Sequence, residues 1–95
     1  MVKESVLITG AGIGIGRATA IRFAEDDYHV FVSDILVSEM EDVVTEIKNF
    51  GGSATAVHLD VTDITSVDEA MNFISSEGPR LGTPYHRKIY ISYCF

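Results

Sequence analysis

Residues 9–17 read Thr9-Gly10-Ala11-Gly12-Ile13-Gly14-Ile15-Gly16-Arg17, with four glycines among the seven residues from 10 to 16. So many glycines cost backbone entropy on folding, so the conformation of this segment must require them. The segment lies directly after the apolar run of residues 5–9 and directly before a helical pattern. In that position glycines let the backbone approach a phosphate, and the free amides at the helix start attract its charge. A turn that merely packs helix against strand is the alternative, but the strand–loop–helix context favours nucleotide binding.

Apolar runs and helical patterns alternate along residues 1–78. Strands are expected at residues 5–9, 30–34 and 54–59, and helices at residues 17–27, 38–50 and 66–77. Neighbouring parallel strands need a long connection, so short strands joined by helices favour a parallel sheet with right-handed crossovers. The sequence therefore predicts an α/β fold of β-α-β-α-β-α order. The alternating residues 88–93 add a candidate short fourth strand, of a kind that suits a half-exposed edge.

Short motifs mark the ends of the expected helices. Ser38-Glu39-Met40-Glu41 and Ser66-Val67-Asp68-Glu69 have the form of a capping box, in which serine and glutamate satisfy unpaired amides at a helix start. Gly51-Gly52 is expected to end the second helix, and Gly78-Pro79 the third. At Asp27-Tyr28, where the first helix ends, a glycine would be more comfortable than the residues present.

The spacing of the glycines narrows the class of nucleotide. A P-loop needs a lysine that this loop lacks, which excludes ATP or GTP hydrolysis of that type. The pattern G-x-G-x-x-G also fails, because Arg17 or Thr19 stands where its third glycine would be. The spacing that fits is Gly10-x-x-x-Gly14-x-Gly16, preceded by Thr9.

This pattern resembles the short-chain dehydrogenase/reductase family, whose members are Rossmann-fold enzymes that move hydride between NAD(P) and an alcohol or carbonyl. Asp60-Val61-Thr62-Asp63 is similar to the family's element beside the adenine ring, and Gly51-Gly52 lies where the family often has a glycine break. The resemblance covers about residues 3–78. It implies an incomplete, doubly wound Rossmann-like sheet, with residues 1–78 as a partial NAD-binding domain and residues 79–95 as a divergent tail.

Asp34 is a candidate for selecting the cofactor. It ends the second expected strand, 18 residues after Gly16 (34 − 16), near the ~20-residue offset of an acid that binds the ribose hydroxyls of NAD. Its carboxylate would repel the extra phosphate of NADP, and Ile13 and Ile35 supply no positive charge to offset this. The sequence therefore predicts NAD in preference to NADP. A solvated strand-end aspartate is the alternative.

The resemblance and the loop together give a set of expected cofactor-binding residues. For Asp60, an Asx cap of the turn into the third helix is the alternative to a binding role. The set comprises Gly10, Gly12, Ile13, Gly14, Ile15, Gly16, Asp34, Ile35, Asp60 and Val61.

No catalytic residue is assigned within the 95 residues. In the family, the proton is handled by a tyrosine with a lysine four residues on, helped by an upstream serine and an asparagine, all beyond the fourth strand. Those residues and the family's Asn-Asn-Ala-Gly segment are absent here. Tyr85 and Lys88 are three residues apart and come too early in the chain, so surface residues before a strand are the simpler interpretation.

Two functions follow as hypotheses. The first is the NAD(H)-binding portion of a short-chain oxidoreductase that is not catalytic alone. The second is a non-catalytic nucleotide-binding or partner-binding half-domain, whose exposed sheet edge invites self-association. The charge and the aromatic content of the sequence change after Gly78. This change suggests that the tail arises from a frameshift, alternative splicing or truncation of a longer gene.

Composition excludes several other classes. The chain is 46% hydrophobic and 22% charged, which is typical of a globular domain. Its net charge of −7 argues against nucleic acid and anionic membranes as partners, although three of its seven basic residues lie in the acid-free residues 79–95. The lone Cys94 forms no internal disulfide, and no Cys/His cluster has zinc spacing. With no apolar segment long enough for a signal peptide or membrane span, a cytoplasmic protein without a metal site is expected.

Overall fold

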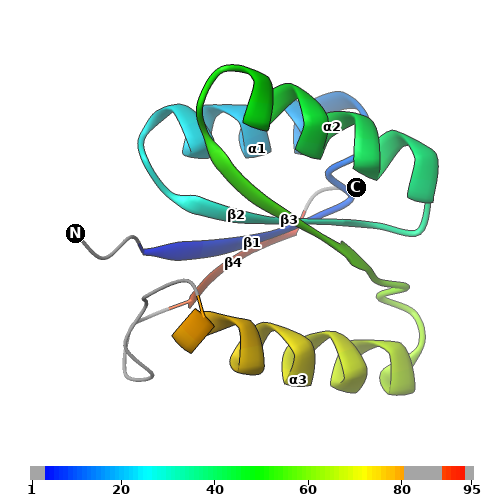
Figure 1. Cartoon of the computed structure of the whole chain (residues 1–95). Helices are drawn as coiled ribbons and strands as arrows, with labels where there is room; N and C mark the ends of the chain where they lie inside the picture. The colour runs from blue at the N-terminus through cyan, green and yellow to red at the C-terminus, as the bar shows by residue number, and fades with distance from the viewer. Residues whose placement is uncertain (1–3, 81–88, 94–95) are drawn as a thin grey trace.

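A computed structural model of the chain describes residues 4–80 and 89–93, with side chains described for residues 4–76. Strands and helices alternate along the chain, as the sequence predicts (Figure 1). In order, the elements are β1 (Ser5–Thr9), α1 (Gly14–Glu25), β2 (His29–Asp34), α2 (Val37–Asn49), β3 (Ser53–His58), α3 (Ile64–Arg80) and β4 (Ile89–Tyr93).

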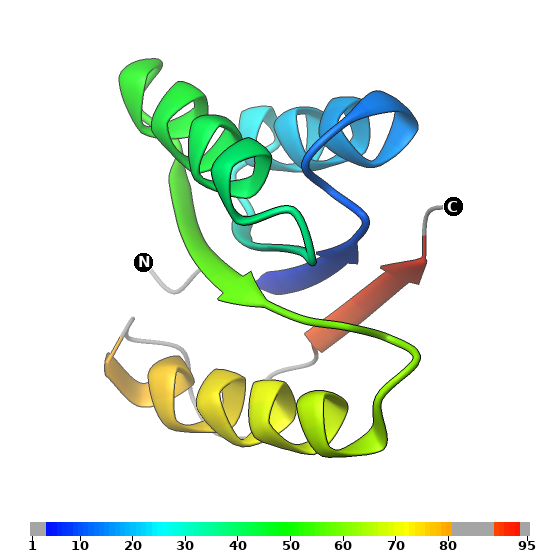
Figure 2. The same ribbon diagram turned by 90° about the vertical axis from the view of Figure 1, so that its right-hand side faces the viewer.

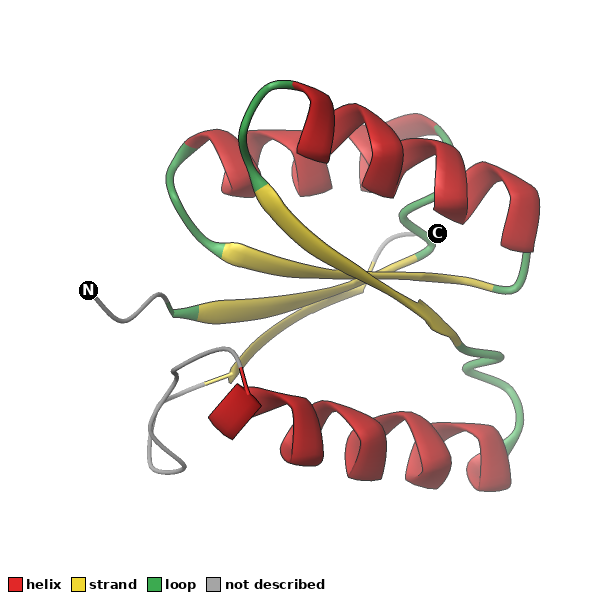
Figure 3. Cartoon of the chain, viewed as in Figure 1, coloured by secondary structure: helices red, strands yellow, loops and turns green. Residues whose placement is uncertain are grey.

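The four strands form one parallel sheet in the order β3-β2-β1-β4 (Figure 3). The fourth strand, expected at residues 88–93, pairs with β1 from Ser5↔Ile89 to Thr9↔Tyr93. It therefore joins the sheet from within the segment that the sequence separates as a tail. The division into residues 1–78 and 79–95 stays a prediction.

The helices cover both faces of this sheet. Helices α1 and α2 lie on one face and α3 on the other, as Figure 1 and the turned view in Figure 2 show. From β1 the chain steps outward through β2 to β3, then crosses back to place β4 on the opposite side of β1. This reversal is the topological switch point at which doubly wound sheets open a crevice for ligands.

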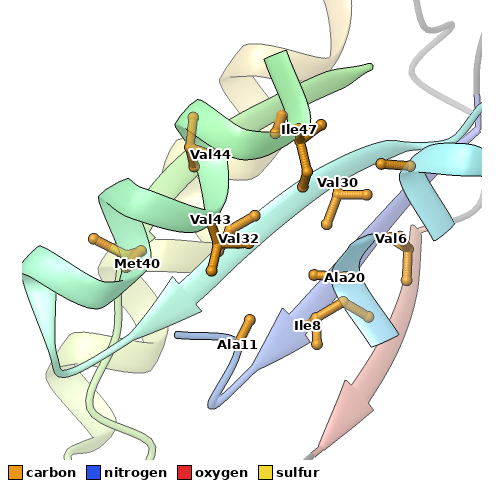
Figure 4. Close-up of a cluster of buried hydrophobic side chains, with 12 residues drawn as sticks. Val6, Ile8, Ala11, Ala20, Val30, Val32, Met40, Val43, Val44 and Ile47 are labelled. Atoms are coloured by element: carbon orange, nitrogen blue, oxygen red, sulfur yellow. The ribbon is translucent and has the colours of Figure 1, made fainter. Parts of the chain in front are cut away.

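Alternation along the two inner strands divides the core between the faces. Val6 and Ile8 of β1 pack with α1 and α2 in one apolar cluster (Figure 4), while the intervening Leu7 belongs to a second cluster with α3. In β2, Phe31 likewise joins the α3 side. Every residue of β1 and β2 is buried, which confirms that they are strands covered on both faces.

The helices begin earlier than the sequence predicts. Helix α1 starts at Gly14, inside the glycine segment. The capping boxes that the sequence predicts for α2 and α3 are both wrong. Ser38 lies inside α2, whose N-cap is Leu36. Ser66 lies inside α3, and Asp63 takes the capping position, with its Oδ1 accepting the Thr65 amide at 3.0 Å. An aspartate before the helix competes with a serine for the same role, and the sequence pattern does not rank them.

The helix ends differ in how well the sequence marks them. Helix α2 ends as expected, because Gly51 has φ +88° and the Gly52 amide bonds the Ile47 carbonyl in a Schellman motif. Helix α1 ends in the same motif, but the left-handed residue is Asp27, with φ +69°. Gly78-Pro79 does not stop α3, which continues to Arg80. Proline interrupts the interior of a helix, and here the helix ends one residue after Pro79.

In the described part of the chain, no helix is long and apolar enough to cross a membrane.

Candidate functional site

The carboxyl ends of β1, β2 and β3 bring three loops to the same edge of the sheet. The glycine segment follows β1, residues 35–36 follow β2, and Leu59 and Asp60 follow β3. Backbone hydrogen bonds join the loops after β1 and β3 to the end of β2, because the Ala11 amide donates to the Ser33 carbonyl at 2.9 Å and the Leu59 amide to the Asp34 carbonyl at 3.3 Å. Most of the cofactor-binding residues that the sequence predicts therefore lie on neighbouring backbone.

The glycine segment adopts a conformation that other residues would not. Gly10 and Gly14 have φ +64° and +59°, in the left-handed region. Gly16 lies so close to the end of β1 that a Cβ there would be 2.1 Å from the Gly10 carbonyl oxygen. The three glycines that define the pattern are thus explained by backbone geometry, two by their torsion angles and one by close packing of helix against strand.

The start of α1 is open to an anion. Its N-cap is Ile13, and among the described residues no side chain caps the amides of the first turn. That turn also carries no acidic residue. The helix start therefore presents backbone donors and the positive end of its dipole, the arrangement that binds phosphate groups.

Asp34 is held in place by two backbone amides. Its Oδ2 accepts the Gly12 amide at 2.8 Å, and its Oδ1 accepts the Leu36 amide at 3.1 Å. The residue is 7% exposed, so the alternative of a solvated strand-end aspartate is wrong. Each carboxylate oxygen has a second lone pair, so the group can accept further hydrogen bonds.

One pocket of about 260 Å³ gathers most of the expected cofactor-binding residues. It also includes Leu36, which the sequence analysis missed. The sequence signal that could have identified Leu36 is its place as an apolar residue two positions after Asp34, the acid at the end of the strand. The lining comprises Gly10, Ile13, Gly14, Ile15, Gly16, Asp34 and Leu36.

The remaining expected residues are not part of the lining of this pocket. The Gly12 amide donates to Asp34, while Ile35 and Val61 are about half exposed on the loops after β2 and β3. A role for these residues in cofactor binding stays a prediction.

Asp60 organises the turn that leads from β3 into α3. Its Oδ1 accepts both the amide of Thr62 at 2.9 Å and the hydroxyl of Thr62 at 2.6 Å, which is an Asx turn. These two bonds, the hydroxyl's first, lower the pKa of the Asp60 carboxyl, and nearby His58 lowers it further. The structural alternative for Asp60 is therefore present, and it leaves the other carboxylate oxygen to serve a ligand.

Other candidate chemistry is limited. Within residues 4–76, no three His, Cys, Asp or Glu side chains come together as metal ligands. Tyr85 and Lys88, considered above for catalysis, and the lone Cys94 lie outside the residues that the structure describes.

Comparison with known proteins gives a consistent family. The model of the family described as short chain dehydrogenase matches residues 4–83. An uncharacterized oxidoreductase, YxbG, of Bacillus subtilis is 45% identical over 65 residues, which cover 68% of this chain and 24% of that protein. The 7alpha-hydroxysteroid dehydrogenase of Escherichia coli is 41% identical over 74 residues, covering 78% of this chain and 29% of the enzyme.

Solved structures agree with this assignment. A hydroxysteroid dehydrogenase from Escherichia coli superposes with a TM-score of 0.81 at 34% identity, covering 97% of this chain and 36% of that one. A 7alpha-hydroxysteroid dehydrogenase complexed with NADH and 7-oxo glycochenodeoxycholic acid gives a TM-score of 0.76 at 39% identity, covering 79% of this chain and 29% of that one. The chain thus spans between 24% and 36% of the length of these relatives. It belongs to the short-chain dehydrogenase family, whose members are NAD(P)-binding oxidoreductases with a Rossmann fold.

Proposed function

We propose that this chain is the NAD(H)-binding portion of a short-chain oxidoreductase and does not catalyse hydride transfer alone. The observation that carries the proposal is the pocket in which the glycine loop, the uncapped start of α1 and the Asp34 carboxylate meet. Amides for a diphosphate and a carboxylate for ribose hydroxyls are the two recognition elements of a dinucleotide site.

Each recognition element has a distinct task in the proposed site. The amides at the start of α1 would hold the diphosphate, because they are free and lie at the positive end of the helix dipole. The Asp34 carboxylate would accept the hydroxyls of the adenine ribose, while Asp60 and Val61 would lie beside the adenine. Bound NAD would supply the nicotinamide that accepts or gives hydride.

We propose NAD rather than NADP as the cofactor. A phosphate on the ribose would meet the buried negative charge of Asp34, which no neighbouring cation offsets by an ion pair among the described residues. The cation of the glycine segment, Arg17, is already engaged, because its guanidinium bonds both carboxylate oxygens of Glu46 at 2.7 Å. Charge at this end of the pocket therefore favours the unphosphorylated ribose.

The proposed lack of independent catalysis rests on the sequence. Hydride transfer requires a group that supplies or removes a proton at the substrate oxygen. The family's serine and Tyr-x-x-x-Lys are absent from the 95 residues. We also propose the cytoplasm as the site of action, which the lone cysteine and the composition favour.

Titration of the 95-residue chain with NADH, followed by the fluorescence of the reduced nicotinamide, tests this function. We expect saturable binding that is tighter for NADH than for NADPH, and no oxidation of simple alcohols with NAD. Asp68→Ala, an exposed control on α3, should bind both cofactors with unchanged affinity. Asp34→Ala should reduce the difference between the affinities for NADH and NADPH. Absence of NADH binding would refute the proposal, and equal affinities in the unmodified chain would refute the role of Asp34.

A second function, a partner-binding half-domain, is favoured by the sheet edges. Both β3 and β4 pair with a neighbour on one side only, among the described strands. Unpaired strand edges template association with other chains. We propose self-association through such an edge, which sedimentation velocity across a range of concentrations would detect. A monomer at every concentration would refute it.

The coding DNA provides a separate test of the tail. Translation in all three frames beyond codon 70 should recover Asn-Asn-Ala-Gly and Tyr-x-x-x-Lys if the tail comes from a frameshift. Their absence from every frame would favour the half-domain.

A further inference from the structure

Gly12 is the one glycine of the segment that the family pattern does not require. The pattern places glycine at positions 10, 14 and 16 and leaves position 12 open. The torsion angle of Gly12 is not in the left-handed region either. A different constraint must therefore account for glycine at this position.

That constraint is contact with Asp34. The amide of Gly12 donates to Asp34 Oδ2 at 2.8 Å in a buried hydrogen bond. A Cβ built on Gly12 would lie 2.8 Å from the same oxygen and 3.0 Å from the Cβ of Glu39. The first distance is shorter than side chains tolerate, so a side chain at position 12 would force a shift.

The carboxylate is the part that would have to move. The loop backbone is fixed on one side by the bond from the Ala11 amide to the Ser33 carbonyl at 2.9 Å. It is fixed on the other side by Gly16, which touches the Gly10 carbonyl. The Asp34 side chain, in contrast, ends in an oxygen that can rotate away from Gly12 and lose that hydrogen bond.

We propose that Gly12 is a positioning residue for cofactor specificity: it sets where the Asp34 carboxylate lies and thereby selects an unphosphorylated ribose. The proposal rests on the function proposed above. Gly12 contributes a hydrogen bond to Asp34 Oδ2, and its missing side chain leaves space for that oxygen. Leu36 holds the other oxygen, so the two amides together fix the orientation of the carboxylate.

The test is a double-mutant cycle that measures NADH and NADPH affinities of the full 95-residue chain. Gly12→Ala should weaken NADH binding by about 3- to 10-fold, the value of one hydrogen bond, and weaken NADPH binding less. The NADH/NADPH affinity ratio should therefore fall. In an Asp34→Ala background, where the colliding oxygen is absent, Gly12→Ala should leave that ratio unchanged.

Gly51→Ala is the matched control. It also adds a methyl group to a glycine, at φ +88° and with open space around it, at the end of α2 away from the site. We expect it to lower stability and leave the affinity ratio unchanged. If Gly12→Ala weakened the binding of both cofactors equally, the NADH/NADPH affinity ratio would stay unchanged, and that result would overturn the proposal.

Hydrogen exchange covers the case in which Gly12→Ala does not fold. The Gly12 amide should exchange faster in Asp34→Ala than in the unmodified chain, because its acceptor is gone. Equal exchange rates of the Gly12 amide in the two chains would show that it does not donate to Asp34, and would overturn the proposal. If the unmodified chain bound neither cofactor, the proposed function itself would fail, which separates the two outcomes.

Discussion

Gly16 packs against the carbonyl group of Gly10 without room for a side chain. A Cβ on Gly16 would lie 2.1 Å from that oxygen and 2.7 Å from the carbonyl carbon. Both atoms belong to the backbone, which cannot rotate away as a side chain can. The contact joins the end of β1 to the first turn of α1, so it fixes the geometry of the proposed diphosphate site.

Gly16→Ala is therefore expected to destabilise the fold by about 2–3 kcal/mol, as overpacking of a rigid site does. Urea unfolding followed by circular dichroism measures this. Gly14→Ala is the control, since its Cβ would meet nothing within 4 Å and only the left-handed φ of +59° costs about 1–2 kcal/mol. If Gly16→Ala proved as stable as the unmodified chain, Gly16 would not pack closely against the Gly10 carbonyl group.

Asp34 is expected to stabilise the fold as well as to bind ribose. Asp34→Asn keeps one acceptor oxygen but turns the other into a donor, so one of the two amides, Gly12 or Leu36, loses its partner. Leaving a buried amide unsatisfied costs about 1–3 kcal/mol, which urea unfolding would detect. Asp68→Asn, an exposed residue on α3, should change stability by less than ~0.5 kcal/mol. Equal effects of the two substitutions would contradict the anchoring of Asp34.

The parts of the fold that depend on pattern were predictable from the sequence. The order of elements follows from where apolar residues recur, and the structure confirms it. The strand-end position of Asp34 also followed from spacing. These features depend on burial over many residues, which no single side chain can override.

The helix starts and the finer contacts were not predictable in the same way. Ser38 and Asp34 are both capable of bonding backbone amides near the start of α2, and the choice depends on the path of the loop after β2. The contact of Gly12 with Asp34 spans 22 residues of sequence and appears only when the loops meet. Such choices depend on tertiary geometry, so local motifs did not reveal them.

Asp27 is expected to be a position whose backbone favours glycine over alanine. Its φ of +69° places it in the left-handed region at the end of α1, where glycine pays no steric penalty. Asp27→Gly should leave a higher free energy of unfolding than Asp27→Ala, by about 0.5–1 kcal/mol, because both substitutions remove the aspartate side chain and only glycine adopts this φ without strain. The neighbouring Asp26 has φ −87°, so Asp26→Gly should lower stability instead. A lower stability of Asp27→Gly than of Asp27→Ala would refute this account.

Thr62 is expected to control the titration of Asp60. Its hydroxyl and amide bond the ionised carboxylate, which lowers the pKa of Asp60 below its ordinary value. Because the folded pKa is the lower one, the interaction stabilises the fold above the unfolded pKa of about 4 and is lost as pH falls through the folded pKa. Carbon-13 NMR of the carboxyl group across pH 2–7 measures that value directly.

Thr62→Val removes the hydroxyl but keeps the amide and the shape of the side chain, so the pKa of Asp60 should rise part of the way toward its ordinary value. Thr65→Val is the control, because Asp63 bonds the amide of Thr65 rather than its hydroxyl, and Asp60 should titrate as before. An unchanged Asp60 titration in Thr62→Val would show that the hydroxyl does not bond the carboxylate. A shift in Thr62→Val alone would establish that the Thr62 hydroxyl bonds the Asp60 carboxylate.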